Sequence, residues 1–297
     1  MKSRYWFLIL TLWGFIFVSI VFNGIITAEP EIMVSSTSIR QGEFFQIKVQ
    51  AAPESVVRVI FQGVTKTLQR SEDGTFMGLM AAYYFKEPDF YPLGVEITGQ
   101  DQKVITALYQ IEVGERKFPE SRIFMEEKKR KTILTTSNQE SDTKKVTEAR
   151  KKAMLDAKAP LWNGPFIWPL TGTVTTEFGF TRFVNNIANG RHSGIDIAAP
   201  EGTRVLATND GQVVFAGNLY LTGLTVIIYH GLDLYSSYGH LSALKVQDGT
   251  SVAKGDLIGL VGSTGLSTGP HTHFTIRIGE TPVDPYLFLE KEVSWGF

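Results

Sequence analysis

The sequence predicts a mostly β protein with two β domains behind an N-terminal apolar segment. Short apolar runs separated by turn residues occur before residue 113 and again after residue 160, and no long helical pattern interrupts the second set. A chain of 297 residues with 43% hydrophobic and 20% charged residues is long enough for about two folded domains. We expect a transmembrane signal anchor (1–28), a small β-sandwich (29–113), a basic, partly helical linker (114–159) and a second, antiparallel β-sheet domain (160–297).

Charge and cysteine content narrow the chemistry. The 29 basic and 30 acidic residues nearly cancel, so a nucleic-acid partner is not expected. There are no cysteines, which excludes disulfides, thiolate zinc sites and a cysteine nucleophile. Any metal ion must therefore be held by His, Asp or Glu.

The N-terminal segment indicates the compartment. Residues 5–27 carry no charge, and as a helix they would measure about 34 Å, enough to cross a bilayer core. Lys2 and Arg4 precede the segment, so the positive-inside rule places the rest of the chain outside the cytoplasm. We expect a single-pass membrane protein. A signal peptide cleaved after Ile26-Thr27-Ala28, which would give a secreted protein, is the alternative.

The region 29–113 contains short β runs bounded by turn signals such as Asp73-Gly74. Their spacing and alternation predict an immunoglobulin-like sandwich. The expected strands are Ile32–Val34, Phe44–Val49, Val56–Phe61, Thr75–Ala82, Leu93–Thr98 and Val104–Val113. No residue cluster in it indicates chemistry, so we interpret it as a spacer or a binding module.

The connector is basic. Between Arg116 and Lys152 there are twelve Lys and Arg and six Asp and Glu, a net charge of 12 − 6 = +6. Residues Glu148–Ala157 have helical spacing of apolar side chains, which predicts a short helix. The connector is either a solvated linker or a segment attracted to anionic polymers or lipid head groups.

The region after Pro160 is again β, with glycine at its turns. Expected strands are Thr203–Ala207, Gly211–Ala216, Leu224–Tyr229, Leu234–Leu241, Asp256–Val261 and Phe274–Ile278. Gly202-Thr203-Arg204-Val205 is echoed by Gly249-Thr250-Ser251-Val252, which indicates a duplicated β unit.

All five histidines lie between His192 and His273. His192 and Asp196 are four residues apart with Gly194 between them, and a tight bend there would turn both side chains toward one point. His271 and His273 lie at the start of a strand pattern, where residues i and i+2 share a face. Two histidines and one aspartate make a three-ligand site with an open position, as in catalytic zinc centres.

The other two histidines have separate expectations. His240 ends an alternating strand and could reach the same site from a neighbouring strand. An imidazole placed there suits proton transfer or stabilisation of negative charge. His230 lies in the hairpin turn His230-Gly231-Leu232-Asp233 and is expected to be structural.

These motifs resemble the lysostaphin-like zinc metallopeptidases, peptidoglycan endopeptidases with the duplicated hybrid motif fold. The resemblance covers about 130 residues, from Trp168-Pro169 to Val283-Asp284-Pro285. It is carried by Phe178-Gly179, His192-Ser-Gly-Ile-Asp196-Ile-Ala-Ala-Pro200, Gly211-Gln-Val-Val-Phe-Ala-Gly217, Tyr238-Gly-His-Leu-Ser242, Val252-Ala-Lys-Gly255, Gly262-Ser-Thr-Gly265 and Ser267-Thr-Gly-Pro-His-Thr-His-Phe274.

The resemblance implies one Zn²⁺ held by His192, Asp196 and His273, with His240 and His271 as catalytic histidines. It implies a peptidoglycan peptide as substrate, and leaves open which histidine moves which proton and whether a protein regulator takes part. Thr272 stands where the family more often has Leu. The alternative is an inactive homologue that binds peptidoglycan and regulates another hydrolase, although such proteins typically lose ligands that this chain keeps.

Two further readings are excluded by context. Gly265-Leu-Ser267-Thr-Gly269 fits the Gly-x-Ser-x-Gly form of serine hydrolases, but Pro270 and a β pattern follow it where a helix is required. The helical His-Glu-x-x-His motif of other metalloproteases is absent from the sequence.

Overall fold

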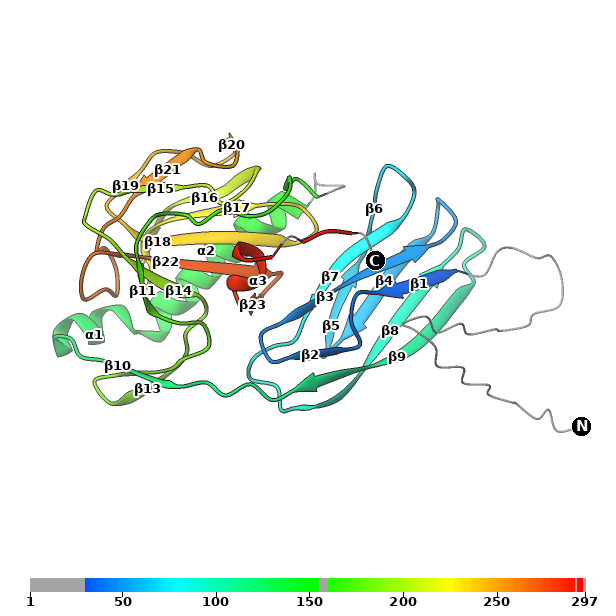
Figure 1. Cartoon of the computed structure of the whole chain (residues 1–297), viewed down its shortest axis with the longest axis horizontal. Coiled ribbons are helices and arrows are strands. Elements are labelled where there is room, and N and C mark those ends of the chain that lie inside the picture. The colour runs from blue at the N-terminus through cyan, green and yellow to red at the C-terminus, as the bar shows by residue number, and fades with distance from the viewer. Residues whose placement is uncertain (1–29, 155–159, 292, 296–297) are drawn as a thin grey trace, which may run out of the picture.

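The computed structural model describes residues 30–154, 160–291 and 293–295. The expected anchor, residues 1–28, lies outside this part of the chain. Among the residues that the structure describes, no helix combines the length and the apolar character needed to cross a membrane. The described chain is mostly β, with the strands gathered in two bodies joined by a segment that contains two helices (Figure 1).

The N-terminal body is a two-sheet sandwich. Its strands are β1 (Glu31–Val34), β2 (Ser38–Arg40), β3 (Phe44–Gln50), β4 (Val56–Phe61), β5 (Val64–Thr67), β6 (Gln69–Arg70), β7 (Phe76–Ala81), β8 (Asp89–Thr98) and β9 (Val104–Gly114). One sheet has the order β1-β3-β7-β6 and the other β2-β9-β8-β4-β5. Alternate residues such as Ile47, Val59 and Ile111 are fully buried between the sheets, which is the pattern that predicted the sandwich.

The C-terminal body is built on one large sheet. Its strands are β11 (Thr173–Thr176), β14 (Ile195–Ala198), β16 (Gly211–Leu219), β17 (Gly223–Tyr229), β18 (Leu234–Leu241), β20 (Ser251–Val252), β22 (His271–Ile278) and β23 (Thr281–Val283). They are antiparallel in the order β11-β14-β22-β18-β17-β16-β20, with β23 paired to β22. A small second sheet contains β15 (Arg204–Leu206), β19 (Ala243–Leu244) and β21 (Leu257–Leu260).

Both faces of the large sheet are covered. Val226, Ile228 and Leu234 point into the main core, which also contains side chains from the small sheet and from α3 (Tyr286–Leu289). The alternating residues Tyr229 and Tyr235 point to the opposite face, where they are buried in a separate cluster. Because β17 is buried on both faces, its sequence is apolar at most positions rather than at alternate positions.

The connector differs from the expected short helix. Its strand β10 (Glu120–Ile123) pairs in parallel with β12 (Thr181–Val184), which in turn pairs with β13 (Ile187–Arg191). Helix α1 (Glu127–Ile133) follows, and then α2 (Thr136–Met154), which begins twelve residues before the position expected from the apolar spacing.

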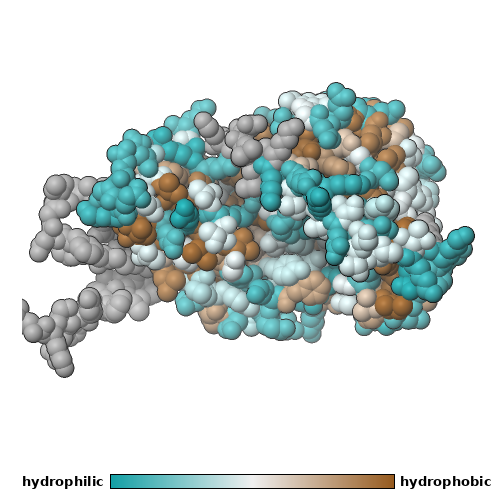
Figure 2. Space-filling view, turned by 180° about the vertical axis from the view of Figure 1, so that it is seen from behind, coloured by the Kyte–Doolittle hydropathy of each residue, from teal (hydrophilic) through white to brown (hydrophobic). Residues whose placement is uncertain are grey.

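Helix α2 is packed on the protein rather than fully solvated. The helix crosses the large sheet (Figure 1) on the face that carries the buried cluster of Tyr229 and Tyr235. Val146 of the helix packs against that cluster. Two charged residues of α2 that are buried, Asp142 and Arg150, contact the C-terminal body, while the lysines at 144, 145 and 151 are exposed. Seen from behind, the surface is largely hydrophilic, with hydrophobic residues in small separate groups (Figure 2).

The two bodies contact each other directly. Phe44 of the sandwich stacks on Phe288, with ring centroids 4.9 Å apart. The Asp284 amide donates to the Gly42 carbonyl at 2.9 Å, and Arg116 of the connector pairs with the Asp284 carboxylate at 2.6 Å. The sandwich therefore packs against the segment that follows β23, which contains Asp284 and α3.

Candidate metal centre

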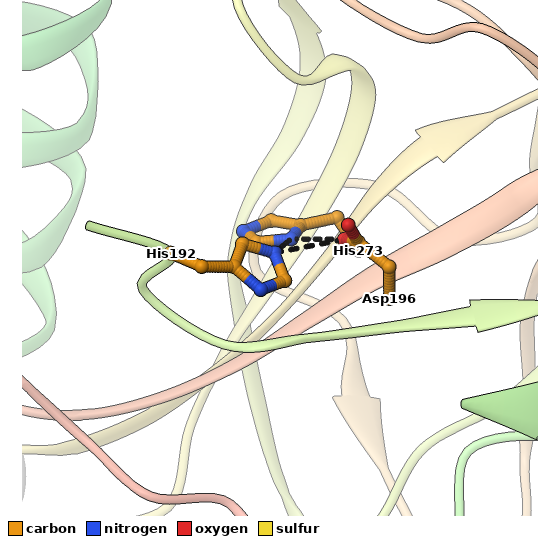
Figure 3. Close-up of side chains that lie close together, drawn as sticks. All are labelled: His192, Asp196 and His273. Carbon is orange, nitrogen blue, oxygen red and sulfur yellow. Dashed lines mark hydrogen bonds and ion pairs between the residues drawn. The ribbon is translucent and has the colours of Figure 1, made fainter. Parts of the chain in front are cut away.

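Three residues of the histidine region converge on the large sheet, at strands β14 and β22. Asp196 on β14 and His273 on β22 are direct cross-strand partners, so their side chains lie together on one face. His192 precedes β14 and reaches the same point, and the three side chains face one another (Figure 3). The structure thus brings together the three residues named as ligands in the sequence analysis.

Gly194 has a clear role in this convergence. The chain bends there, as expected, but the glycine does not have a positive φ. A Cβ at this position would lie 2.0 Å from the carbonyl oxygen of Phe274, so only glycine lets the His192–Asp196 segment approach β22 this closely. The requirement is for close backbone approach rather than for a left-handed turn.

The donor atoms form a compact set. His192 Nε2 lies 2.9 Å from Asp196 Oδ1, and His273 Nδ1 lies 2.8 Å from the same oxygen and 2.9 Å from His192 Nε2. One ligand atom from each residue lies within 4.8 Å of the other two, so the set could hold a metal ion. Two imidazole nitrogens and one carboxylate oxygen are ligands that suit Zn²⁺.

Outer contacts orient these ligands. The ring nitrogen His192 Nδ1 lies 2.9 Å from the Glu177 carbonyl oxygen, an acceptor that keeps the proton on Nδ1 and leaves Nε2 free to bind. Arg182 on β12 donates to Asp196 Oδ2 at 2.9 Å, so Oδ1 faces the histidines. The sequence analysis missed Arg182, because its approach depends on the β12–β13 hairpin and no spacing rule marks it.

The protonation states suit metal binding. Burial lowers the pKa of His273 to about 4, so the imidazole is neutral near pH 7. Burial by itself would raise the pKa of Asp196, but the close approach of the His192 and His273 imidazoles outweighs it and holds that pKa well below its ordinary value. Neutral imidazole and ionised carboxylate are the forms that coordinate a metal.

His240 and His271 lie beside the three donors. Their ring centroids are 4.6 Å apart, and His240 is 6.0 Å from His273. Each has its Nδ1 against a backbone carbonyl, His240 at 2.7 Å from Thr264 and His271 at 2.8 Å from Gly269. This contact fixes the proton on Nδ1 and leaves Nε2 as the nitrogen that can accept another.

His240 has an unusual backbone conformation and a buried side chain. Its φ is +61°, in the left-handed region that is unfavourable for residues other than glycine. Burial, followed by the charges of His271 and His273, lowers the pKa of His240 to about 3. The structure thus brings all four expected site histidines together around Asp196.

His230 lies elsewhere. It is fully buried in the turn between β17 and β18, with Nδ1 2.7 Å from the Asp210 carbonyl and Nε2 2.7 Å from Ser236 Oγ. Both ring nitrogens are used inside the core, as expected for a structural histidine.

The fold and the donor set define a β-sheet protein with a buried histidine–carboxylate centre of the kind found in metallohydrolases. Residues 190–285 match the family model of peptidase family M23. A relative, the uncharacterized lipoprotein YgeR of Escherichia coli, is 30% identical over 232 residues, covering 75% of this chain and 86% of YgeR. The chain belongs to peptidase family M23.

Two other relatives match the C-terminal body. The DD-carboxypeptidase/endopeptidase Mpg of Neisseria meningitidis is 48% identical over 132 residues, or 44% of this chain and 30% of Mpg. The murein hydrolase activator NlpD of Salmonella typhimurium is 38% identical over 125 residues, or 42% of this chain and 31% of NlpD. The chain thus spans less than a third of either protein.

A solved structure shares the fold over most of the chain. A Pseudomonas aeruginosa protein described as a peptidase M23 superposes with a TM-score of 0.55 at 22% identity, and the match covers 87% of this chain and 93% of the other. At this identity the likeness concerns the fold alone.

Proposed function

We propose that the protein is a zinc metalloendopeptidase that acts outside the cytoplasm and hydrolyses peptide bonds in peptidoglycan cross-links or stems. The observation that carries the proposal is the convergence of His192, Asp196 and His273, with His240 and His271 directly beside them. A purely binding protein has no need of two further oriented imidazoles at a metal site.

The donor set fits zinc. Three protein ligands leave one coordination position open, which is the arrangement of catalytic rather than structural zinc. Zinc, when bound, lowers the pKa of a coordinated water to about 7 and polarises a peptide carbonyl. His192, Asp196 and His273 would hold it, and Arg182 and the Glu177 carbonyl would keep their donor atoms aimed.

The remaining steps belong to His240 and His271. Because each imidazole has its Nδ1 proton committed to a backbone carbonyl, Nε2 is the atom at which a proton is taken from water or returned to the leaving amine. A protonated Nε2 also stabilises negative charge that develops on the peptide oxygen.

Similarity supports the substrate class and location. The Mpg name describes a DD-carboxypeptidase/endopeptidase, and YgeR is named a lipoprotein. The uncharged residues 5–27 behind Lys2 and Arg4 add a sequence argument for membrane attachment, with the domains outside the cytoplasm. A mature protein that stays in the membrane fraction at high salt and begins near Met1 is expected; a mature N-terminus at Glu29 would contradict attachment through this segment.

The second candidate function is regulation of another wall hydrolase, which the NlpD similarity favours. Digestion of cross-linked peptidoglycan with the purified full-length protein separates the two. An endopeptidase releases new amino groups and shortened muropeptides, whose masses identify the bond, and His192→Ala abolishes the release. A regulator releases nothing alone but raises the rate of an added hydrolase, and His192→Ala leaves that effect intact.

A further inference from the structure

Helix α2 of the connector contacts the loop that adjoins the catalytic histidines. Residues 220–222 form the short loop between β16 and β17, and Tyr220 and Leu221 are 46% and 38% exposed. Side chains this exposed give the loop little packing of its own. Beside the Thr222 Oγ1–Thr225 Oγ1 hydrogen bond at 2.8 Å, backbone hydrogen bonds therefore contribute much of what holds the loop in position.

Asp142 supplies that backbone contact. Asp142 Oδ1 accepts a hydrogen bond from the Tyr220 amide at 2.9 Å, and Oδ2 accepts one from the Leu221 amide at 3.0 Å. The Asp142 residue is 9% exposed, so these bonds are shielded from water and both carboxylate oxygens are used. The exposed Lys145 of the same helix adds a longer contact, from Nζ to the Asn218 carbonyl at 3.3 Å, but the buried Asp142 carboxylate binds the two loop amides directly.

The 220–222 loop in turn forms a backbone hydrogen bond with His240. The Thr222 carbonyl accepts from the His240 amide at 2.6 Å, at the residue whose φ is +61°. A Cβ on neighbouring Gly239 would lie 3.0 Å from Thr222 Cβ, which shows how closely the loop is apposed to the strand end. A shift of the loop therefore moves the backbone of His240.

The same loop also supports the segment before His271. The Leu221 carbonyl accepts from the Leu266 amide at 2.8 Å, and a Cβ on Gly265 would lie 2.4 Å from the Gly223 nitrogen. The Thr264 carbonyl in this segment is the acceptor that orients His240 Nδ1. The loop held by Asp142 therefore supports both contacts of His240: it supplies the Thr222 carbonyl, and it packs against the segment that supplies the Thr264 carbonyl.

We propose that Asp142 is a positioning residue for the peptidase site: it holds the 220–222 loop against His240 and the 264–266 segment, which makes helix α2 part of the catalytic unit. The inference rests on the proposed function for its effect on turnover, but the geometry of the loop stands apart from it. It predicts that the connector is required for full activity even though it contributes no ligand.

The test compares Asp142→Asn and Asp142→Ala with wild type in the full-length protein. Asparagine keeps the shape of the side chain but replaces one accepting oxygen with an amide that only donates. Glu140→Gln is the matched control, because Glu140 is an exposed carboxylate on the same helix. Zinc content, amide hydrogen exchange at Tyr220 and Leu221, and kcat and KM on a soluble cross-linked muropeptide are measured.

Both Asp142 variants should keep one zinc, exchange the two amides at least about 10-fold faster and lose about 10-fold or more in kcat, with KM within about twofold. Glu140→Gln should match wild type. Unchanged exchange and unchanged kcat in Asp142→Asn would overturn the proposal, as would loss of zinc in parallel with kcat. If Asp142→Ala does not fold, Asp142→Asn decides. Wild type without turnover would refute the proposed function, and the exchange comparison would still decide whether Asp142 holds the loop.

Discussion

At the scale of single residues, the site separates into three donors that could hold a metal ion and two imidazoles to which we assign proton transfer. His192, Asp196 and His273 face one another with donor atoms under 3 Å apart, whereas His240 and His271 have Nδ1 committed to backbone carbonyls. We therefore expect substitution of a donor to remove both zinc and activity, and substitution of His240 or His271 to reduce turnover without loss of zinc.

Removal of a ligand should remove the metal. In His192→Ala or His273→Ala only two protein donors remain, so bound zinc and activity should fall together to background. Metal analysis after gel filtration checks this. Full zinc occupancy in either variant would show that the ligand assignment is wrong.

Removal of a proton-transfer group should leave the metal in place. His240→Ala and His271→Ala keep all three donors, so zinc content should match wild type while kcat falls about 10²- to 10⁴-fold. Turnover on a soluble cross-linked muropeptide is the measurement. A kcat near that of wild type would remove the histidine concerned from the mechanism.

His230 predicts a pH dependence of stability. Burial lowers its pKa to about 4, against about 6.5 in an unfolded chain. Between these values the unfolded state binds more protons, so the contribution is complete above pH 6.5 and is lost as the pH falls toward 4, up to about 3 kcal/mol. His230→Gln should reduce the slope of unfolding free energy against pH over this window, while the buried His240 and His273 keep their own contribution; parallel plots for the two proteins would contradict the assignment.

Much of the site was predictable at this scale, because strand periodicity alone puts His271 and His273 on one face and two histidines with one carboxylate suggest zinc. Arg182 and the Glu177 carbonyl were not predictable. Their contacts with the ligands depend on how a hairpin and a loop fold over the sheet edge, and a guanidinium or a backbone carbonyl has no spacing signature.

At the scale of elements, the strands followed from alternation and turn residues, while the connector did not. Helix α2 has few apolar residues to form a stripe, and it docks through Val146 together with the polar contacts of Asp142 and Arg150. A periodicity analysis detects apolar stripes and cannot detect a helix that is held by a buried carboxylate and a guanidinium.

The connector is also anchored before its helices. Phe118 lies over Gly179, where a Cβ would come 2.1 Å from the ring, and the Gly179 amide donates to the His192 carbonyl at 2.8 Å. The start of the connector therefore packs on the backbone that carries a metal ligand.

This packing gives a matched pair of substitutions. Gly179 and Gly190 both have positive φ, +80° and +75°, but a Cβ on Gly190 meets nothing within 4 Å. Gly190→Ala should cost about 1 kcal/mol of unfolding free energy and Gly179→Ala about 2–4 kcal/mol, because only the second also displaces Phe118. Denaturant unfolding measures both, and Phe118→Ala should relieve part of the Gly179→Ala cost. Equal costs would show that Phe118 does not pack there.

At the scale of the whole molecule, the sandwich, the connector and the C-terminal body form one connected structure. The Lys66–Asp233 ion pair at 2.6 Å and the Phe44–Phe288 stack join sandwich to sheet, and Arg116 links the connector to Asp284. The sequence predicted separate modules, since contacts between distant segments leave no local pattern. The sandwich therefore supports the peptidase body in addition to any binding role of its own.

The central claim is that one zinc ion at His192, Asp196 and His273 makes the protein a peptidoglycan endopeptidase. The most direct test strips the full-length protein with a chelator and titrates zinc back while new amino groups released from cross-linked peptidoglycan are counted. The account predicts no release from the stripped protein and full recovery at one zinc per chain. Saturation of the site at one zinc per chain with no amine released from any peptidoglycan type would contradict it.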